Sequence, residues 1–144
     1  MLKVIPLEFP EIKETAEKLA PTGQLRQVDG LVYLNIDNDY IHRLFPLIEN
    51  TQFLKPDYFS PNKIGAHVSV IYPEENILCG SDDLDRVHGF KIKNVCSATL
   101  NERNYFILTV ASESLFHIRE KYELPKMPIF KGYSVDFHIT IGVY

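Results

Sequence analysis

Two stretches decide the fold: His67-Val68-Ser69-Val70 near the middle of the chain and His138-Ile139-Thr140-Ile141 close to its end. Each stretch has a histidine, an apolar β-branched residue, a small hydroxyl residue and a second β-branched residue. This alternation with a period of two is typical of a half-buried β-strand. Successive side chains of a strand point to opposite faces. The sequence therefore predicts two strands of one design, each with an imidazole beside a hydroxyl on one face and an apolar opposite face.

Length and composition indicate one globular domain over residues 1–144. A chain of 144 residues can bury a sizeable core. Its hydrophobic content of 45% and charged content of 24% are ordinary for a globular protein. The net charge of −4 argues against an extended surface that coats nucleic acid. A small anionic substrate, held by a few local cations, is compatible with this charge.

Cysteine usage and hydropathy lead us to expect a cytoplasmic protein. Cys79 and Cys96 have no metal-ligand spacing, and we interpret them as reduced thiols, with a disulfide between them as the alternative. The N-terminal segment is too short and too interrupted for a signal peptide. No apolar run approaches the roughly 18 residues that a membrane span needs. We expect no membrane association and no obligate protein partner, and hence a monomer.

The predicted elements recur in the same order along the chain. The first series is a strand over 31–36, a helix over 40–49, a loop and the first histidine strand. The second series is a strand over 105–110, a helix over 113–122, a loop and the second histidine strand. These series define two pseudo-repeats, about 31–72 and 104–144. Two such units need each other to bury an apolar face, so we expect them to pack together with the histidine strands facing each other across a groove.

Further local signals predict the remaining elements. A helix begins at Pro10 and ends at Pro21-Thr22-Gly23. Pro46 is expected to kink or divide the helix over 40–49. Ser112 is a suitable cap for the next helix. The predicted strands after the first histidine motif cover 90–95, 96–100 and 104–110, with a hairpin turn over 101–104.

Two imidazoles on opposite sides of one phosphate suit phosphodiester chemistry. The reaction needs a base for the attacking oxygen and an acid for the leaving oxygen, and histidine can serve as either near neutral pH. Ser69 and Thr140 share the faces of His67 and His138, so their hydroxyls can donate hydrogen bonds to the phosphate oxygens. No carboxylate cluster of the kind that holds magnesium accompanies either motif. We therefore expect neither a metal nor another cofactor.

The paired motifs resemble the His-x-Ser/Thr-x signatures of the two-histidine (2H) phosphoesterase superfamily, which includes LigT-like RNA ligases and 2′,3′-cyclic nucleotide phosphodiesterases. The resemblance implies a duplicated α+β fold whose antiparallel sheets form a bilobal, barrel-like groove. It implies metal-independent chemistry on 2′,3′-cyclic phosphates or 2′,5′-linked nucleotides or RNA ends, often in RNA processing. Catalytic roles carry over to His67 and His138, and phosphate-binding roles to Ser69 and Thr140. Hydrolysis and ligation both stay open.

Other side chains near the motifs are candidates for substrate binding. The candidates are Lys55, Lys63, Tyr72, Lys126, Lys131 and Tyr133. Lysines in the loops that lead to the histidine strands can anchor a phosphate, although exposed loop lysines are commonly just solvated. The tyrosines can stack on a base or pack at strand ends. Asp136 precedes His138 by two residues, so it can orient that imidazole or be a solvated acid at the strand end.

Three other interpretations stay open. The same groove could belong to a non-catalytic RNA-binding or nucleotide-binding module. His67 and His138 could instead be metal ligands, although Asp136 is the only obvious further ligand and two histidines alone make a poor zinc site. The repeat could also be purely structural, with its active site lost; the hydroxyls beside both histidines argue mildly against this.

Overall fold

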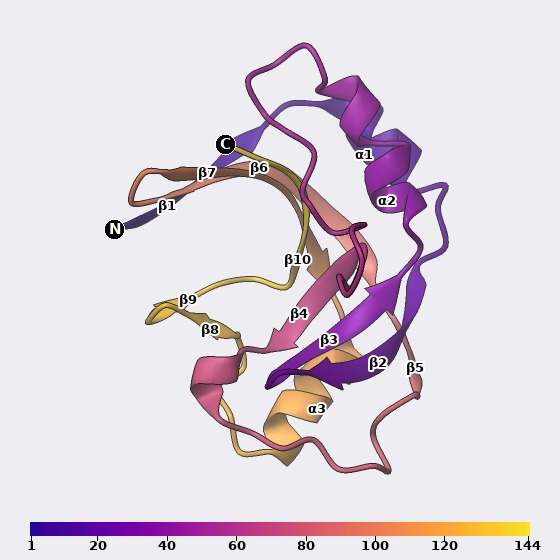
Figure 1. The fold of residues 1–144 in the computed structure, drawn as a ribbon, viewed down its shortest axis with the longest axis vertical. Helices are drawn as coiled ribbons and strands as arrows, with labels where there is room; N and C mark the ends of the chain where they lie inside the picture. Colours follow the sequence, from indigo (N-terminus) through magenta and orange to yellow (C-terminus); the bar gives the residue numbers. More distant parts are fainter.

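A computed structural model describes residues 1–144 and shows a strongly curved antiparallel sheet (Figure 1). Its strands in chain order are β1 (Leu2–Leu7), β2 (Thr22–Val28), β3 (Leu31–Ile36), β4 (His67–Ile71), β5 (Val87–Gly89), β6 (Lys91–Leu100), β7 (Arg103–Ala111) and β10 (His138–Val143). Two further short strands, β8 (Ile129–Phe130) and β9 (Tyr133–Ser134), form a separate hairpin. In Figure 1 this hairpin lies on the concave side of the large sheet.

The two histidine strands are neighbours at the centre of this sheet. The strand order is β1-β6-β7-β10-β4-β3-β2-β5, and all pairings are antiparallel. Outward from the central pair, β4 is followed by β3 and β2, and β10 by β7 and β6. The predicted mixture of helices and an antiparallel sheet is confirmed. Each histidine strand thus has a hairpin beside it.

The sheet stays open, so the barrel-like groove that the resemblance implied is not a closed barrel. Its free edges are β1 and β5, which do not pair with each other. β5 has only 3 residues, and β1 carries Pro6, which has no N–H to donate. Short strands and strands with proline are typical of sheet edges, where they discourage further pairing.

Three helices accompany the sheet: α1 (Pro10–Ala16), α2 (Asp39–His42) and α3 (Glu113–Lys121). Figure 1 places α1 and α2 on the convex side of the sheet. Apolar residues of all three helices join one core cluster with the apolar face of the histidine strands. Within that cluster Val68, Val70, Ile139 and Ile141 are completely buried. The opposite face of β4 and β10, which carries the histidines, is therefore left on the concave side.

Most predicted elements are present, with shifts that have local causes. The helix predicted over 40–49 is divided, since α2 ends at His42 and a 3₁₀ turn, η1 (Phe45–Leu47), contains Pro46. The strands predicted over 90–95 and 96–100 are one strand, β6. The Ser112 hydroxyl caps α3 by accepting a hydrogen bond from the Leu115 N–H at 3.3 Å. β2 was not predicted, because Thr22-Gly23 resembles a helix end.

No helix of the structure combines the length and apolar character that a membrane crossing requires. Both cysteines, Cys79 and Cys96, are buried and are not joined in a disulfide.

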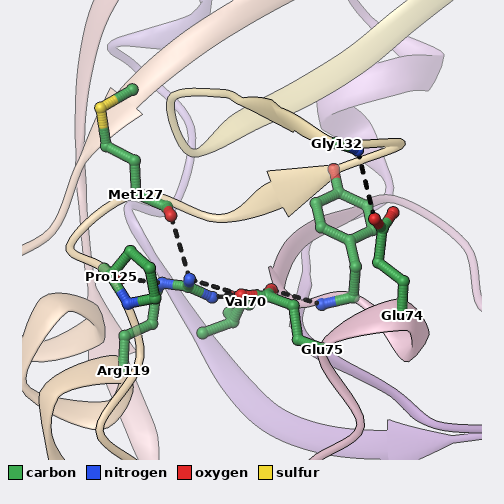
Figure 2. Close-up of polar contacts among 8 residues, drawn as sticks. Val70, Glu74, Glu75, Arg119, Pro125, Met127 and Gly132 are labelled. Atoms are coloured by element: carbon green, nitrogen blue, oxygen red, sulfur yellow. Dashed lines mark hydrogen bonds and ion pairs between the residues drawn. The ribbon is translucent and has the colours of Figure 1, made fainter.

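A fully buried arginine on α3 holds several segments together (Figure 2). Arg119 donates from Nε to the Pro125 carbonyl at 2.8 Å and from Nη1 to the Val70 carbonyl at 2.9 Å. Nη1 and Nη2 also donate to the Glu75 carboxylate, at 2.9 and 2.6 Å, and Nη2 donates to the Met127 carbonyl at 3.0 Å. All five guanidinium N–H groups therefore have an acceptor. The network joins α3, the end of β4 and the segment that leads to β8.

The β8–β9 hairpin is attached to the same region by a second glutamate. η2 (Pro73–Glu75) follows β4 directly and contains Glu74. The Glu74 carboxylate accepts hydrogen bonds from the N–H groups of Lys131 and Gly132 at the hairpin turn. Figure 2 shows the bond from Gly132, which is 3.2 Å long. Lys131 and Gly132 have φ values of 50° and 84°, a left-handed pair that suits a tight hairpin. The hairpin is therefore fixed relative to the end of β4.

We predict that Arg119→Met destabilises the fold by about 3–5 kcal/mol, because it leaves the buried Glu75 carboxylate without its partner. Urea unfolding followed by circular dichroism measures this change in the free energy of unfolding. Arg26→Met is the matched control, since Arg26 forms an exposed pair with Asp85 at 3.4 Å. That control is expected to change stability by about 1 kcal/mol or less. Equal losses in both variants would contradict the role assigned to Arg119.

Candidate active site

The pairing of β4 with β10 brings the two motifs together. Ile139 lies opposite Val68 in an antiparallel register. Each histidine therefore lies beside the hydroxyl residue of the other motif. The cross-strand pairs are His67 with Thr140 and His138 with Ser69. The two imidazoles stand on the diagonal of this four-residue set, which corresponds to a spacing of about 7–8 Å between backbones.

This arrangement corrects the expectation that the strands face each other across a groove. β4 and β10 are instead adjacent strands of one sheet. Direct pairing gives the backbone N–H and C=O groups of each strand a partner in the other strand. Two strands that faced each other across a groove would need other partners for these groups. The histidines therefore share one face of one sheet.

All four motif side chains line one cavity of about 360 Å³. Its remaining polar lining is contributed by Tyr58, Tyr72, Tyr105, Thr109, Ser134 and Asp136. Its apolar lining is contributed by Leu2, Val4, Ala98, Leu100, Ile107, Met127, Phe130 and Val135. The cavity thus lies between the histidine strands, the β8–β9 hairpin and the strands β1, β6 and β7. A polar end at the motifs and an apolar wall are typical of sites for small molecules.

Both imidazoles are oriented by the same backbone device. Nδ1 of His67 lies 2.8 Å from the Gly65 carbonyl oxygen, and Nδ1 of His138 lies 2.8 Å from the Asp136 carbonyl oxygen. A carbonyl oxygen can only accept, so in each ring Nδ1 carries the hydrogen. Nε2 is then the atom left to take or give a proton in the cavity. Gly65 has a φ of 73°, a left-handed conformation that glycine adopts without strain.

Asp136 acts on His138 differently from the side-chain contact anticipated from the sequence. Its main-chain carbonyl, and not its carboxylate, accepts the hydrogen bond from the imidazole. The carboxylate lies 3.8 Å from the Lys93 Nζ, and both side chains are more than 40% exposed. The peptide link fixes the carbonyl position, so it orients the ring more rigidly than a carboxylate would.

The surroundings lower the pKa of both histidines below the ordinary value of 6.5. Burial is the main cause for His67; the hydrogen bond to Gly65 opposes it, and the charge of His138 adds to it. Burial is also the main cause for His138, opposed by the carbonyl and the carboxylate of Asp136. Both rings are therefore mainly neutral at pH 7. When only one of the two rings is protonated, the charge of Asp136 favours the state in which His138 carries the proton.

Two tyrosines complete the polar end of the cavity. The Tyr58 ring contacts His67, with ring centroids 4.9 Å apart. Burial raises the pKa of Tyr58, and the Thr140 hydroxyl partly offsets this. Burial likewise raises the pKa of Tyr72, partly offset by Ser69. Each motif hydroxyl thus has a protonated phenol nearby, and a protonated phenol can donate a hydrogen bond.

The structure places most of the other candidates for substrate binding outside this cavity. Tyr72 lines it, but Lys55, Lys63, Lys126, Lys131 and Tyr133 do not. Lys55 Nζ lies 3.0 Å from Nδ1 of His42, and Lys126 Nζ lies over the Phe116 ring at 5.2 Å. All five side chains outside the cavity are exposed. As a result, no lysine or arginine lines the cavity.

Several lining residues were missed by sequence reasoning. Tyr58 lies in the loop before β4, where nothing local marks it as part of a site. Thr109 pairs with His138 across β7 and β10. The alternation of side chains along β7 places Thr109 on one face of the strand. That face can be assigned to the cavity only once the order of the strands in the sheet is known. Leu2 and Val4 come from β1, whose place at the sheet edge depends on its pairing with β6.

The alternative of a metal site gains no further ligand from the fold. The structure brings together no group of three or more His, Cys, Asp or Glu residues that could hold a metal ion. Metal independence itself stays a prediction.

A comparison with family models matches residues 32–144 to the model described as Swiss Army Knife, 2H phosphoesterase domain (2H-SAK). The chain belongs to this 2H phosphoesterase family. The match includes both histidine motifs, and it confirms the resemblance noted from the sequence. Membership implies a phosphoesterase that acts on phosphodiesters in general. Comparisons with curated proteins and with solved structures gave no match.

We predict that His138→Gln raises the pKa of His67. The substitution removes the positive charge that lowers the His67 pKa and keeps a polar side chain of similar size. A ¹H–¹⁵N NMR titration of the imidazoles measures the change and also reports whether Nδ1 carries the hydrogen. His117→Gln is the control, because His117 is exposed and lies outside the cavity. An unchanged or lower His67 pKa in His138→Gln would show that the two rings are not electrostatically coupled.

Proposed function

We propose that this 2H phosphoesterase is a metal-independent phosphodiesterase that acts on 2′,3′-cyclic phosphates or on 2′,5′-linked nucleotides or RNA ends. The observation that carries the proposal is the pair of imidazoles in one cavity, each fixed through Nδ1 by a carbonyl two residues earlier. Two imidazoles with free Nε2 atoms can supply the base and the acid that in-line displacement at phosphorus needs. Neutral hydroxyls between them can hold the phosphate oxygens.

The proposed reaction divides the two roles between the rings. His67 takes the proton from the attacking water or hydroxyl, and His138 donates a proton to the leaving oxygen. This assignment is supported by two effects. The carbonyl and charge of Asp136 oppose the lowering of the His138 pKa, and the charge of His138 adds to the lowering of the His67 pKa. Ser69 and Thr140 donate hydrogen bonds to the non-bridging oxygens, where negative charge develops in the transition state. Ligation uses the same groups in reverse.

We also propose that the two pseudo-repeats, about 31–72 and 104–144, derive from one duplicated unit. Equivalent strands flank the two histidine strands: β3 and then β2 lie beside β4, and β7 and then β6 lie beside β10. The matching Nδ1–carbonyl bonds in both motifs support this proposal further.

The alternative function is a non-catalytic module that binds RNA or nucleotides in the same cavity. The aromatic and apolar wall, with Tyr105 and Phe130, could hold a base without any turnover. The alternative differs from the enzyme in what the histidines contribute. In a binding module they would contribute to affinity, whereas in the enzyme they contribute chiefly to the rate.

We predict that His67→Ala and His138→Ala each lower turnover about 10²–10⁴-fold, because each removes a general acid or base. The assay uses the four nucleoside 2′,3′-cyclic monophosphates and a 2′,5′-linked dinucleotide, with EDTA present. The isomer of the monophosphate product shows which oxygen leaves. His117→Ala, outside the cavity, is the matched control and is expected to retain wild-type turnover. Equal loss of ligand affinity in both variants, without any wild-type turnover, would favour the binding module.

We predict that kcat/KM is highest below pH 6.5 and falls about tenfold per pH unit above it. The free enzyme can react only when His67 is neutral and His138 is protonated. Because the pKa of His138 is lowered from 6.5, His138 loses its proton below pH 6.5. A bound anionic phosphate raises the pKa of His138, so kcat should decline at higher pH than kcat/KM. Steady-state kinetics between pH 4.5 and 9 give both profiles. A kcat/KM plateau that extends above pH 8 would contradict this assignment.

A further inference from the structure

The cavity is unusual for an anion site because no cationic side chain of lysine or arginine lines it. Its hydroxyl donors near the motifs belong to Ser69, Thr140, Tyr58 and Tyr72, and these groups are neutral, as are the other hydroxyls of the lining. The only permanently charged lining residue at neutral pH is an acid, Asp136. Since the pKa of both histidines is lowered, they add little positive charge in the free enzyme.

Two lysines that contact residues of the lining do not themselves line the cavity. Lys93 Nζ, from β6, lies 3.8 Å from the Asp136 carboxylate, but the pair is exposed and therefore screened by solvent. Lys131 Nζ lies over the Phe130 ring at 5.2 Å, outside the cavity. The Asp136 side chain lines the cavity together with His138, and its charge acts on that imidazole, opposing the lowering of the His138 pKa. An additional negative charge on a ligand held at His138 is therefore repelled by Asp136.

We propose that the cavity selects singly charged phosphodiesters over doubly charged phosphomonoesters, with Asp136 as the residue that sets this charge selectivity. The inference deepens the proposed function and rests on phosphate binding at the two motifs. A phosphodiester carries one negative charge, whereas a phosphomonoester, with a second pKa of about 6, carries nearly two above neutral pH. Neutral donors satisfy the oxygens of either ligand, but only an additional cation would offset the second charge.

The selectivity has a consequence for turnover. Hydrolysis of a cyclic phosphodiester breaks one P–O bond, adds the elements of water and yields a monoester that loses a further proton near neutral pH. The product then carries more negative charge than the substrate, and the Asp136 carboxylate repels this additional charge. Charge repulsion therefore favours product release.

The test compares two probes that differ in charge but carry the same aromatic group. Methyl phenyl phosphate is a monoanion and phenyl phosphate is mainly a dianion at pH 8. Titration calorimetry measures both dissociation constants for the wild-type protein, Asp136→Asn, Lys93→Gln and a control, Asp29→Asn. Asp29 lies in the turn between β2 and β3, outside the lining, and its substitution changes the net charge equally.

We expect the wild-type protein to bind methyl phenyl phosphate about tenfold more tightly than phenyl phosphate, a ratio equivalent to one unit of log Kd. Asp136→Asn should reduce the ratio by strengthening phenyl phosphate binding. Lys93→Gln should increase it, because the carboxylate loses its partner. Asp29→Asn should leave it at the wild-type value. Opposite shifts in two exposed-residue variants would not arise from misfolding.

Equal or tighter binding of phenyl phosphate to the wild-type protein would overturn the inference, as would a ratio that Asp136→Asn leaves unchanged. The turnover assay with the cyclic monophosphates and the 2′,5′-linked dinucleotide distinguishes failure of this inference from failure of the proposed function. Turnover without charge preference overturns the inference alone. Charge preference without turnover of any tested phosphodiester supports the inference and overturns the proposed catalysis. Failure of both probes to bind, together with no turnover, overturns both.

Discussion

The buried ion pair between Arg119 and Glu75 is the interaction on which one wall of the cavity depends. It ties the end of β4, at Val70, to α3 and to the segment at Pro125 and Met127. A buried charge of this kind is tolerated only when every donor is satisfied, and here all five are. The neighbouring Glu74 extends the same attachment to the β8–β9 hairpin. The side chains that close the cavity opposite β1 and β6 are held in place in this way.

The second determinant of the site is the register of β4 against β10. One pairing position, Val68 with Ile139, fixes where all four motif side chains lie. A slip of one residue would turn the histidines toward the convex core and the buried aliphatic side chains into the cavity. That slip is opposed by the packing of the apolar face of both strands, whose side chains are fully buried in the core cluster. Core packing and active-site geometry are therefore one constraint.

The chemistry of the cavity follows from what it lacks as much as from what it holds. The lining offers hydroxyls, phenols and two imidazoles of lowered pKa, with a carboxylate nearby and no lysine or arginine. Neutral hydrogen-bond donors, and not cationic side chains, therefore make up its polar lining beside the imidazoles. The family assignment covers residues 32–144, yet β1 contributes Leu2 and Val4 to the apolar wall. The N-terminal strand thus extends the cavity beyond the matched segment.

The sequence by itself determined the two histidine strands, their polar and apolar faces, and the identity of the four motif residues. These follow from an alternation of period two, which is a local property of the chain. The tertiary structure alone decided that the strands are adjacent rather than opposed, that the sheet is open, and that Tyr58, Thr109 and β1 reach the cavity. It also decided that Lys55, Lys63, Lys126, Lys131 and Tyr133 do not reach it. Strand order and loop paths depend on pairings between distant residues, and no local pattern encodes those pairings.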